Sequence, residues 1–374
     1  MPKACYIHIP FCVSGNARNK NKQYSASKCY YCSFVSYNSI DLIPKYVKTL
    51  ISEIKKYYKD EELKTLYFGG GTPSLLEPKH YFEIINCFNF ENSPEITIEL
   101  NPENGNFDYL SRIRELGINR LSIGAQSFNN ELLKKIGRTH TAEQIYNTVT
   151  NAKKAGFENI SLDLIYGLPS QTPELINYDL ECLLKLNIQH ISTYGLKIEK
   201  ESYWGSNPPD NIPDDDLQAD MYERICSVLN KNNYYRYEVS NFSIKGFESK
   251  HNLTYWNNEE YYGFGISAHG YIDGIRYSNH TNFDDYFNSN DYRENSHKLS
   301  EKEKLEEEIF LGLRKTAGIN IQKINELYNI DFERKYADVL FEYSDYFIKT
   351  DSYLALNQKG IMLSNEILPE FLSD

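Results

Sequence analysis

The chain has 374 residues, of which 41% are hydrophobic, enough to bury a sizeable core in one large or two smaller domains. Its 40 basic and 52 acidic residues give a formal net charge of −12, so we expect no nucleic-acid partner. The sequence has no run of 18 apolar residues and its N-terminus lacks a signal-peptide pattern. We therefore expect a cytoplasmic protein, in which clustered cysteines more often bind metal or do redox chemistry than form disulfides.

Short strand-like runs alternate with longer amphipathic stretches through the first two thirds of the chain. The expected strands are 4–9, 65–68, 95–100, 120–123, 160–165 and 190–194. The expected helices between them are 44–59, 79–88, 108–116, 142–155 and 173–186. Strands that alternate with helices form parallel sheets, and six such units favour an α/β fold built on a partial (β/α) TIM-like barrel. Functional side chains of such barrels gather at the carboxyl ends of the strands.

The last third of the chain changes character twice. A polar linker at 207–216 precedes an amphipathic helix whose apolar face repeats every four residues at Leu217, Met221, Ile225 and Leu229. An aromatic, loop-rich stretch then leads to Ser300, which forms a capping box with Glu303. Helices to about 343 and short strands at 346–350 and 353–357 indicate a small winged-helix-like C-terminal domain. We expect a core barrel at 1–235, a loop-rich segment at 236–298 and a helical domain at 299–374.

Three of the seven cysteines lie near one another in the sequence. Cys12 directly follows the first expected strand, and Cys29 and Cys32 form a Cys-X2-Cys pair. Three thiols can hold an iron–sulfur cubane and leave one iron free to chelate a small molecule. Their spacing alone leaves open a redox pair and a zinc site with a fourth ligand elsewhere.

The strings YIHIPFC and KCYYCSF around these cysteines resemble the signature of the radical S-adenosylmethionine (SAM) family, in the branch of the coproporphyrinogen dehydrogenases. The resemblance implies that Cys12, Cys29 and Cys32 bind a [4Fe–4S] cluster. Its open iron would hold the methionine end of SAM, which that family cleaves to a 5′-deoxyadenosyl radical. Sixteen residues separate the first two cysteines here, where the family has three, and removing the thirteen polar residues 15–27 restores the spacing. Loop lengthening costs only about 1–2 kcal/mol, so we expect the site to survive with the insert exposed.

Polar groups follow four consecutive expected strands. A glycine run, Gly69 to Gly71, follows the second, and Glu99, Gln126 and Asp163 follow the next three. Glycines let the backbone approach a ligand closely, although an ordinary strand-ending turn is the alternative. The strings GGGTPS, IELNP, LSIGAQSF and DLIYGLP resemble the same family in the same order. By that resemblance, the residues that contact one or two SAM molecules are Tyr6, Tyr31, Gly70, Gly71, Thr72, Glu99, Gln126, Arg138 and Asp163.

The segment His251-Asn252-Leu253-Thr254-Tyr255-Trp256 combines a possible axial ligand for heme iron with flat apolar faces for a porphyrin. The alternative is a packed aromatic loop with a buried histidine. The segment resembles the HNxxYW motif of the HemW-type heme chaperones, and the resemblance implies that His251, Tyr255 and Trp256 bind heme. The coproporphyrinogen dehydrogenases differ, because they carry a fourth cysteine where Phe34 stands and a longer N-terminal segment.

We therefore expect a heme chaperone that carries a [4Fe–4S] cluster and SAM and passes heme to apo-heme-protein acceptors. Transient contact with membrane-bound acceptors and a homodimer are further expectations. The main alternative is an enzyme, an oxygen-independent coproporphyrinogen III dehydrogenase that performs radical SAM oxidative decarboxylation. A radical SAM enzyme that acts on RNA or protein is another alternative, and the acidic balance disfavours nucleic acid.

Overall fold

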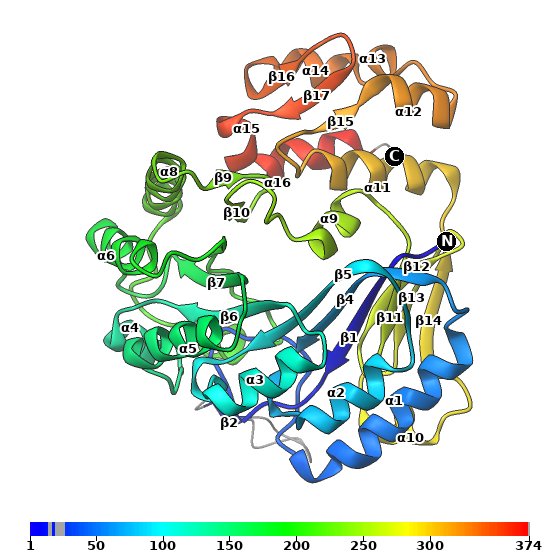
Figure 1. Ribbon diagram of the computed structural model, residues 1–374. Helices are drawn as coiled ribbons and strands as arrows, with labels where there is room; N and C mark the ends of the chain where they lie inside the picture. The colour runs from blue at the N-terminus through cyan, green and yellow to red at the C-terminus, as the bar shows by residue number, and fades with distance from the viewer. Residues whose placement is uncertain (14–16, 19–26, 373–374) are drawn as a thin grey trace.

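The computed structural model describes residues 1–13, 17–18 and 27–372 (Figure 1). The six expected strands are confirmed as parallel strands of the main sheet: β1 (Ala4–Ile9), β4 (Glu62–Gly70), β5 (Asn89–Leu100), β6 (Arg120–Gln126), β7 (Asn159–Tyr166) and β8 (His190–Gly195). The five expected helices are also confirmed: α1 (Ile43–Tyr57), α2 (Pro78–Ile85), α3 (Phe107–Glu115), α5 (Ala142–Lys154) and α6 (Pro173–Leu184). The sequence analysis missed the short helix α4 (Asn130–Lys135).

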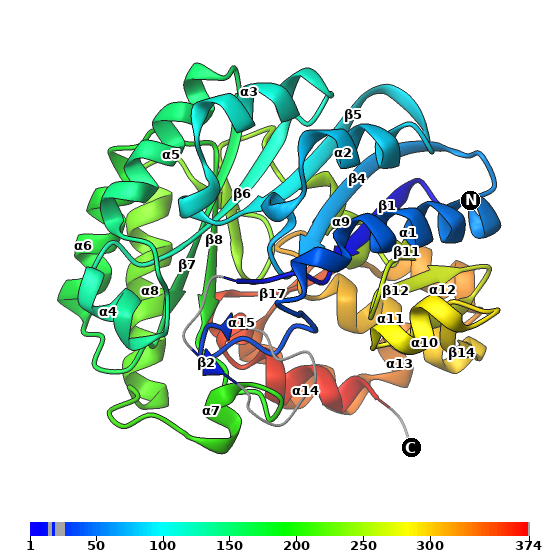
Figure 2. The same ribbon diagram turned by 90° about the horizontal axis from the view of Figure 1, so that it is seen from below.

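These helices form an arc outside the strands, as a partial barrel requires (Figure 2). Strand residues alternate between the two faces. The face toward the helices is apolar and fully buried, as at Ile7, Phe68, Ile98, Ile123 and Leu162. The face toward the barrel interior carries polar side chains, among them Glu99, Ser122 and Asp163. The fold therefore lines its interior with groups that can bind a ligand.

The segment 236–298, expected to be loop-rich, also carries strands that the sequence analysis missed. The strand β11 (Tyr261–Phe264) pairs in parallel with β1, and β12 (His269–Ile272), β13 (Ile275–Asn279) and β14 (Arg293–Lys298) follow in antiparallel order. At the opposite edge β10 (Asn241–Ser243) pairs with β8 and with β9 (Tyr235–Arg236). The segment also holds α9 (Lys250–Trp256) and α10 (Phe283–Asn288). Strands this short, rich in Tyr, Gly and Asn, give no clear alternating signal.

The buried carboxylate of Glu53 connects α1 to residues of the segment 261–298. It accepts hydrogen bonds from the Tyr286 hydroxyl (2.5 Å), the Gly265 amide (2.9 Å) and the Asn279 side chain (2.5 Å). Burial raises the pKa of Glu53 to about 7, even though these bonds favour its charged form. The segment 261–298 therefore packs on α1 through a carboxyl group whose pKa is near neutral.

We expect Glu53→Gln to remove part of the pH dependence of stability. A carboxyl whose pKa is raised by folding stabilises the folded state below its unfolded pKa, and this stabilisation is lost as the pH rises through about 7. Relative to the variant, the wild type should lose about 3 kcal/mol of unfolding free energy between pH 4.5 and pH 8. Urea denaturation of both proteins at these pH values measures the difference. A constant difference would contradict the prediction.

After β8 the chain forms the short helix α7 (Tyr203–Ser206) and then α8 (Asp215–Lys231), which confirms the expected amphipathic helix. The small C-terminal domain comes after β14. Its helices are α11 (Glu301–Gly312), α12 (Ile321–Tyr328), α13 (Phe332–Lys335), α14 (Ala337–Glu342), α15 (Gln358–Met362) and α16 (Ser364–Ile367). The capping box of Ser300 and Glu303 is present at the start of α11. A three-stranded antiparallel sheet joins β15 (Ile319–Asn320), β17 (Tyr353–Leu356) and β16 (Phe347–Lys349). The domain boundaries stay predictions.

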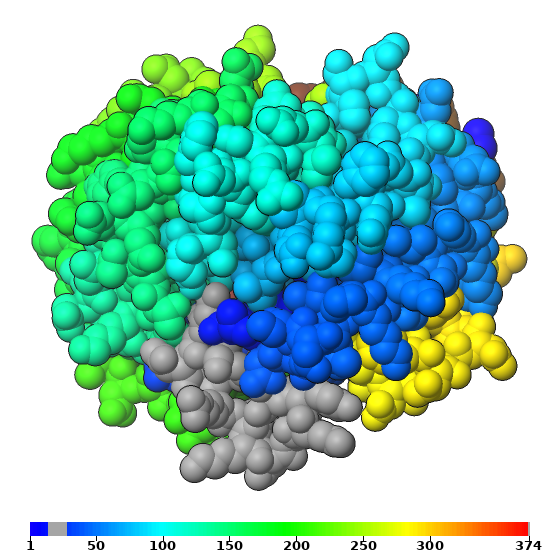
Figure 3. Space-filling model, turned by 60° about the horizontal axis from the view of Figure 1, so that its bottom comes forward, coloured from blue at the N-terminus to red at the C-terminus, as the bar shows by residue number. Residues whose placement is uncertain are grey.

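Figure 1 shows the C-terminal elements above the barrel, with α9 between them and the strands. The opposite face is shown in Figure 3, where α1 to α3, blue to cyan, lie beside the green elements. The insert 15–27 lies mostly outside the described residues; β2 (Ala17–Arg18) pairs there with β3 (Ser27–Lys28). None of the helices in the described ranges has the length and apolar character needed to cross a membrane.

Candidate cluster and cofactor site

The three cysteines that the sequence analysis selected come together at the carboxyl end of β1. Cys12 follows that strand and its amide bonds to the carbonyl of Tyr37 (2.8 Å), while the Cys32 amide bonds to the Cys29 carbonyl (3.2 Å) in a tight turn. Burial raises the pKa of Cys29 and of Cys32, and Cys12 lies near enough to add to both rises. Within the described ranges, no three His, Cys, Asp or Glu side chains converge as the ligands of one metal ion would. In a [4Fe–4S] cubane each thiolate binds a different iron atom. The three cysteines can therefore hold a cluster without lying as close together as the ligands of a single metal ion.

Two of the thiols accept hydrogen bonds. Arg138 Nη1 lies 3.6 Å from the Cys29 sulfur, and Thr72 Oγ1 lies 3.4 Å from the Cys12 sulfur. Asn101 holds both donors, because it donates to Thr72 Oγ1 (3.1 Å) and accepts from Arg138 Nη2 (3.0 Å). Burial raises the pKa of Cys29, and the charge of Arg138 opposes that rise. Since iron binds the thiolate, these donors favour ligation. Asn101 was missed, although it stands in the IELNP string.

The glycine run is explained by packing within the protein. Gly70 has a φ of +113°, and a Cβ there would lie 2.7 Å from the His8 ring. A Cβ on Gly71 would lie 2.5 Å from the carbonyl oxygen of Phe11. The absence of side chains therefore lets this turn pack against β1 and the start of the cysteine loop, a role that the sequence analysis did not consider.

Glu99 is held at the end of β5 by two donors, the Gly70 amide (3.1 Å) and the Tyr67 hydroxyl (2.9 Å). Burial raises the pKa of Glu99 to about 7. The Tyr6 ring stacks on Tyr67 with the ring centroids 6.1 Å apart, and its hydroxyl lies 3.0 Å from His8 Nδ1. These residues make one polar and aromatic wall of the interior. Tyr67 belongs to this wall and was missed, because its role depends on the neighbouring strand.

Gln126 combines a strained backbone with an unpartnered polar atom. Its φ is +60°, a left-handed conformation that costs a residue with a side chain about 1–2 kcal/mol. Its Oε1 is buried and has no hydrogen-bond partner among the described residues. Nearby on β7, Asp163 accepts bonds from Ser122 (3.2 Å), and burial raises its pKa. The Tyr31 ring packs 6.4 Å from that of Trp204. A polar ligand would satisfy the Gln126 oxygen, so these residues fit a cofactor of the SAM type.

His251 lies at the opposite end of the barrel, because it contacts Thr65, about 17 Å before Gly70 along β4. It is 1% exposed, and both ring nitrogens have partners: Nδ1 lies 2.8 Å from Thr65 Oγ1, and Nε2 lies 2.7 Å from the Tyr255 hydroxyl. Its ring stacks on Tyr67 at 4.9 Å, and burial lowers its pKa to about 3. The histidine is therefore neutral and fully hydrogen-bonded in this conformation.

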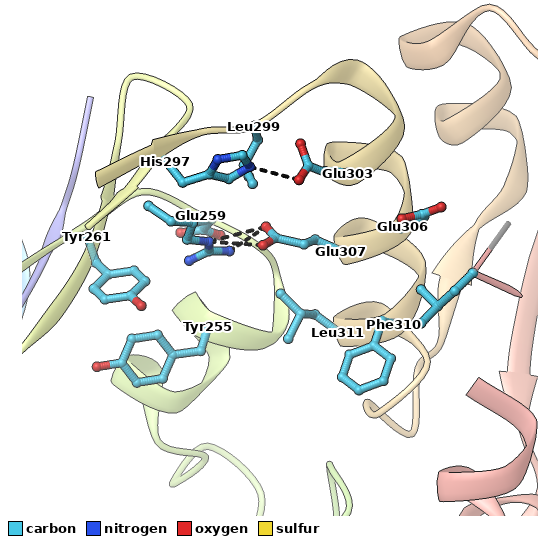
Figure 4. Close-up of a pocket in the computed structure, with 12 residues that line it drawn as sticks. Tyr255, Glu259, Tyr261, His297, Leu299, Glu303, Glu306, Glu307, Phe310 and Leu311 are labelled. Atoms are coloured by element: carbon cyan, nitrogen blue, oxygen red, sulfur yellow. Dashed lines mark hydrogen bonds and ion pairs between the residues drawn. The ribbon is translucent and has the colours of Figure 1, made fainter. Parts of the chain in front are cut away.

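A cavity of about 720 Å³ opens beside this motif, between α9 and α11 (Figure 4). Its walls combine apolar and charged side chains, including Tyr255, Tyr261, Leu299, Phe310, Leu311, Glu259, Arg276 and Glu307. Arg276 and Glu307 form an ion pair of 2.7 Å across it. Trp256 is half-buried outside the cavity, with its ring 5.8 Å from the Arg314 guanidinium and its indole nitrogen buried without a partner among the described residues. The sequence analysis identified Tyr255 but none of the α11 residues.

Comparison with known proteins agrees with this geometry. A model of the radical SAM superfamily matches residues 25–182, and a model of the HemN C-terminal domain matches 299–363. In the search of solved structures, coproporphyrinogen III oxidase (HemN) from Escherichia coli aligns with a TM-score of 0.85 and 21% identity, over 100% of this chain and 90% of that chain. At this identity the likeness shows the fold, and it confirms the partial barrel with a small C-terminal domain.

Sequence relatives carry the assignment further. Heme chaperone HemW of Lactococcus lactis is 40% identical over 385 residues, which span 100% of this chain and 98% of that protein. Heme chaperone HemW of Bacillus subtilis is 35% identical over 391 residues, which span 100% of both. The chain belongs to the family of heme chaperone HemW proteins, within the radical SAM superfamily.

Proposed function

We propose that this chain is a heme chaperone, which binds heme and transfers it to apo-proteins. The observation that carries the proposal is the identity of 40% over nearly the full length of a heme chaperone HemW. The HNxxYW segment supports it, because α9 places this motif beside a cavity of about 720 Å³, within the usual range of ligand sites. The alternative, a coproporphyrinogen III dehydrogenase, is supported by likeness of fold alone.

Membership of the radical SAM superfamily implies a [4Fe–4S] cluster and SAM. We propose that Cys12, Cys29 and Cys32 hold the cluster, with Arg138 and Thr72 stabilising two of the thiolates. When bound, the cluster supplies electrons to SAM. The proposed contacts of SAM are Tyr6, Tyr31, Gly70, Gly71, Thr72, Glu99, Gln126, Arg138 and Asp163. The unpartnered oxygen of Gln126 and the positioned carboxylate of Glu99 support this assignment, because both can accept hydrogen bonds from a polar ligand.

We propose that heme contacts His251, Tyr255 and Trp256. The Tyr255 hydroxyl holds His251 Nε2, and Tyr255 itself lines the cavity. A porphyrin in the cavity that displaces Tyr255 would therefore expose Nε2 to its iron. The buried, neutral state of His251 suits this role, since only neutral imidazole ligates iron.

Incubation of anaerobically reconstituted protein with heme and an apo-cytochrome tests the function. We expect a stable heme complex that passes heme to the acceptor, with heme-free protein as the control. A parallel incubation with coproporphyrinogen III, SAM and a reductant should give no vinyl-bearing product. Efficient conversion of coproporphyrinogen without heme transfer would overturn the proposal in favour of the dehydrogenase.

We expect SAM affinity to fall at least tenfold in Glu99→Gln and in Gln126→Ala. The first change replaces an oxygen of the carboxyl group held by Gly70 and Tyr67 with an amide nitrogen that accepts no hydrogen bond. The second removes an amide whose oxygen has no partner among the described residues. Calorimetric titration of SAM measures both. Gln189→Ala is the matched control, because Gln189 bonds to the backbone at the start of β7. Unchanged affinity in both variants would contradict the assignment of these contacts.

We further propose transient contact with membrane-bound acceptors, a cytoplasmic location and a homodimer. The membrane contact and the homodimer rest on the sequence resemblance. Sedimentation of the loaded protein, together with flotation on lipid vesicles that carry an acceptor, would test the dimer and the membrane contact.

A further inference from the structure

Arg120 opens β6 and points into the barrel interior. Two residues later Ser122 bonds to Asp163, whereas Leu121 and Ile123 pack in the core, and alternation places Arg120 on the face of Ser122. Its register partners are Thr97 of β5 and Asn159 of β7. With 2% exposure, Arg120 is one of the largest fully buried side chains.

The guanidinium of Arg120 has no hydrogen bond and no ion pair among the described residues, and its Nε is buried without a partner. Arginine keeps its positive charge in folded proteins, and a buried guanidinium without hydrogen-bond acceptors destabilises the fold. Both register partners also have unmatched polar atoms, Thr97 Oγ1 and Asn159 Oδ1. Three adjacent strands thus present one row of unsatisfied polar groups to the interior.

Two carboxylates in this part of the barrel accept their hydrogen bonds from other groups. Glu95 accepts from the backbone amides of Lys250 (3.3 Å) and His251 (3.1 Å), and Asp163 accepts from Ser122. His190 lies 2.8 Å from the Tyr237 hydroxyl and is buried. Against the larger effect of burial, the charge of Arg120 lowers the pKa of Asp163, so this carboxylate balances part of that charge. No described residue accepts a hydrogen bond from the guanidinium, and an acceptor supplied by a ligand would complete the site.

We propose that Arg120 binds a carboxylate of a ligand that enters the barrel, and that this carboxylate is a propionate of a tetrapyrrole. The inference rests on the proposed function, since heme carries two propionates. His251 stacks on Tyr67, and Thr97 is the register partner of both Tyr67 and Arg120, so one tetrapyrrole could engage both His251 and Arg120. The methionine carboxylate of SAM is the other source. Its expected site lies near Gln126, about 20 Å away along β6, which favours the propionate.

The test compares heme with heme dimethyl ester, in which both propionates are esterified. The wild type should bind heme at least tenfold more tightly than the ester, and Arg120→Gln should lose this preference by weakening the binding of heme alone. His251→Ala should weaken both ligands alike. Equal binding of acid and ester by the wild type would overturn the proposal and leave buried water as the partner of Arg120.

Three controls keep the outcomes distinct. Iron-free protoporphyrin IX and its dimethyl ester test Arg120 without iron ligation, so an acid preference without heme binding would refute only the chaperone function. No binding of any tetrapyrrole would refute both. A fall in SAM affinity in Arg120→Gln, with heme binding unchanged, would assign the carboxylate to SAM and overturn the propionate. Without ligand, Arg120→Met should leave the Tm unchanged or raise it, because it removes a buried guanidinium that has no hydrogen-bond partner among the described residues. A large fall in Tm would mean that the guanidinium stabilises the fold and would contradict the proposal.

Discussion

Replacement of Cys12, Cys29 and Cys32 by serine should reduce the iron and sulfide bound after reconstitution to less than a tenth of the wild-type content. The three thiols lie near one another at the end of β1, and serine hydroxyls do not replace the thiolates that hold a cubane. Each single substitution should remove most of the cluster as well. Iron and sulfide analysis with the visible absorption spectrum measures the loss.

Cys87→Ser is the matched control, since Cys87 follows α2 and its thiol bonds to the Glu83 carbonyl (3.4 Å). It should keep the full cluster content. Circular dichroism should show that the triple variant is folded, because none of the three cysteines belongs to the apolar core between strands and helices. A brown cluster that persists in the triple variant would refute the ligand assignment and remove the basis for SAM binding at this site.

His251→Ala should lower heme affinity at least tenfold, because it removes the proposed axial ligand. Tyr255→Phe should preserve or raise that affinity. The change keeps the aromatic face toward the cavity but deletes the hydroxyl that holds His251 Nε2 at 2.7 Å. Titration of heme followed by its absorption spectrum measures both effects. The opposite directions separate iron ligation from packing, since a purely structural His251–Tyr255 pair would make both variants weaker.

His190→Ala is a useful comparison for these variants. His190 is also buried in the barrel and bonds to a tyrosine hydroxyl, that of Tyr237, but it lies outside the motif. Its loss should destabilise the protein without changing the spectrum of bound heme. If His190→Ala alone abolished heme binding, His190 would replace His251 as the proposed ligand.

The barrel could be predicted because its strands are short apolar runs between amphipathic helices. Both ends of the strand β1 were predicted correctly. The motifs that follow the strands indicated which strand ends carry the candidate site residues. The strands of 261–298 were missed because tyrosine, glycine and asparagine mask their alternation. The links made by Asn101 and Tyr67 were missed for another reason: each depends on which residues lie opposite on the neighbouring strand, and spacing along the chain does not contain that register.

The same limit applies to the histidine of the motif. Its place in the sequence indicated a heme ligand, whereas its two hydrogen bonds come from Thr65, 186 positions away, and from Tyr255, one helical turn along. The alternative of a buried histidine therefore describes the conformation seen here, and the role in heme binding requires Tyr255 to move.

Tyr67 lies between the proposed SAM site and the heme motif, since its hydroxyl bonds to Glu99 and its ring stacks on His251. A ligand that takes over the Glu99 carboxylate must release this phenol, and the histidine then loses part of its support. The two ligands would in that case be thermodynamically linked: SAM would change the affinity for heme, and heme would change the affinity for SAM by the same factor. Tyr67→Phe removes this hydroxyl and would therefore uncouple the binding of SAM from the binding of heme. With the hydroxyl in place, the protein would take up heme differently according to whether SAM is bound.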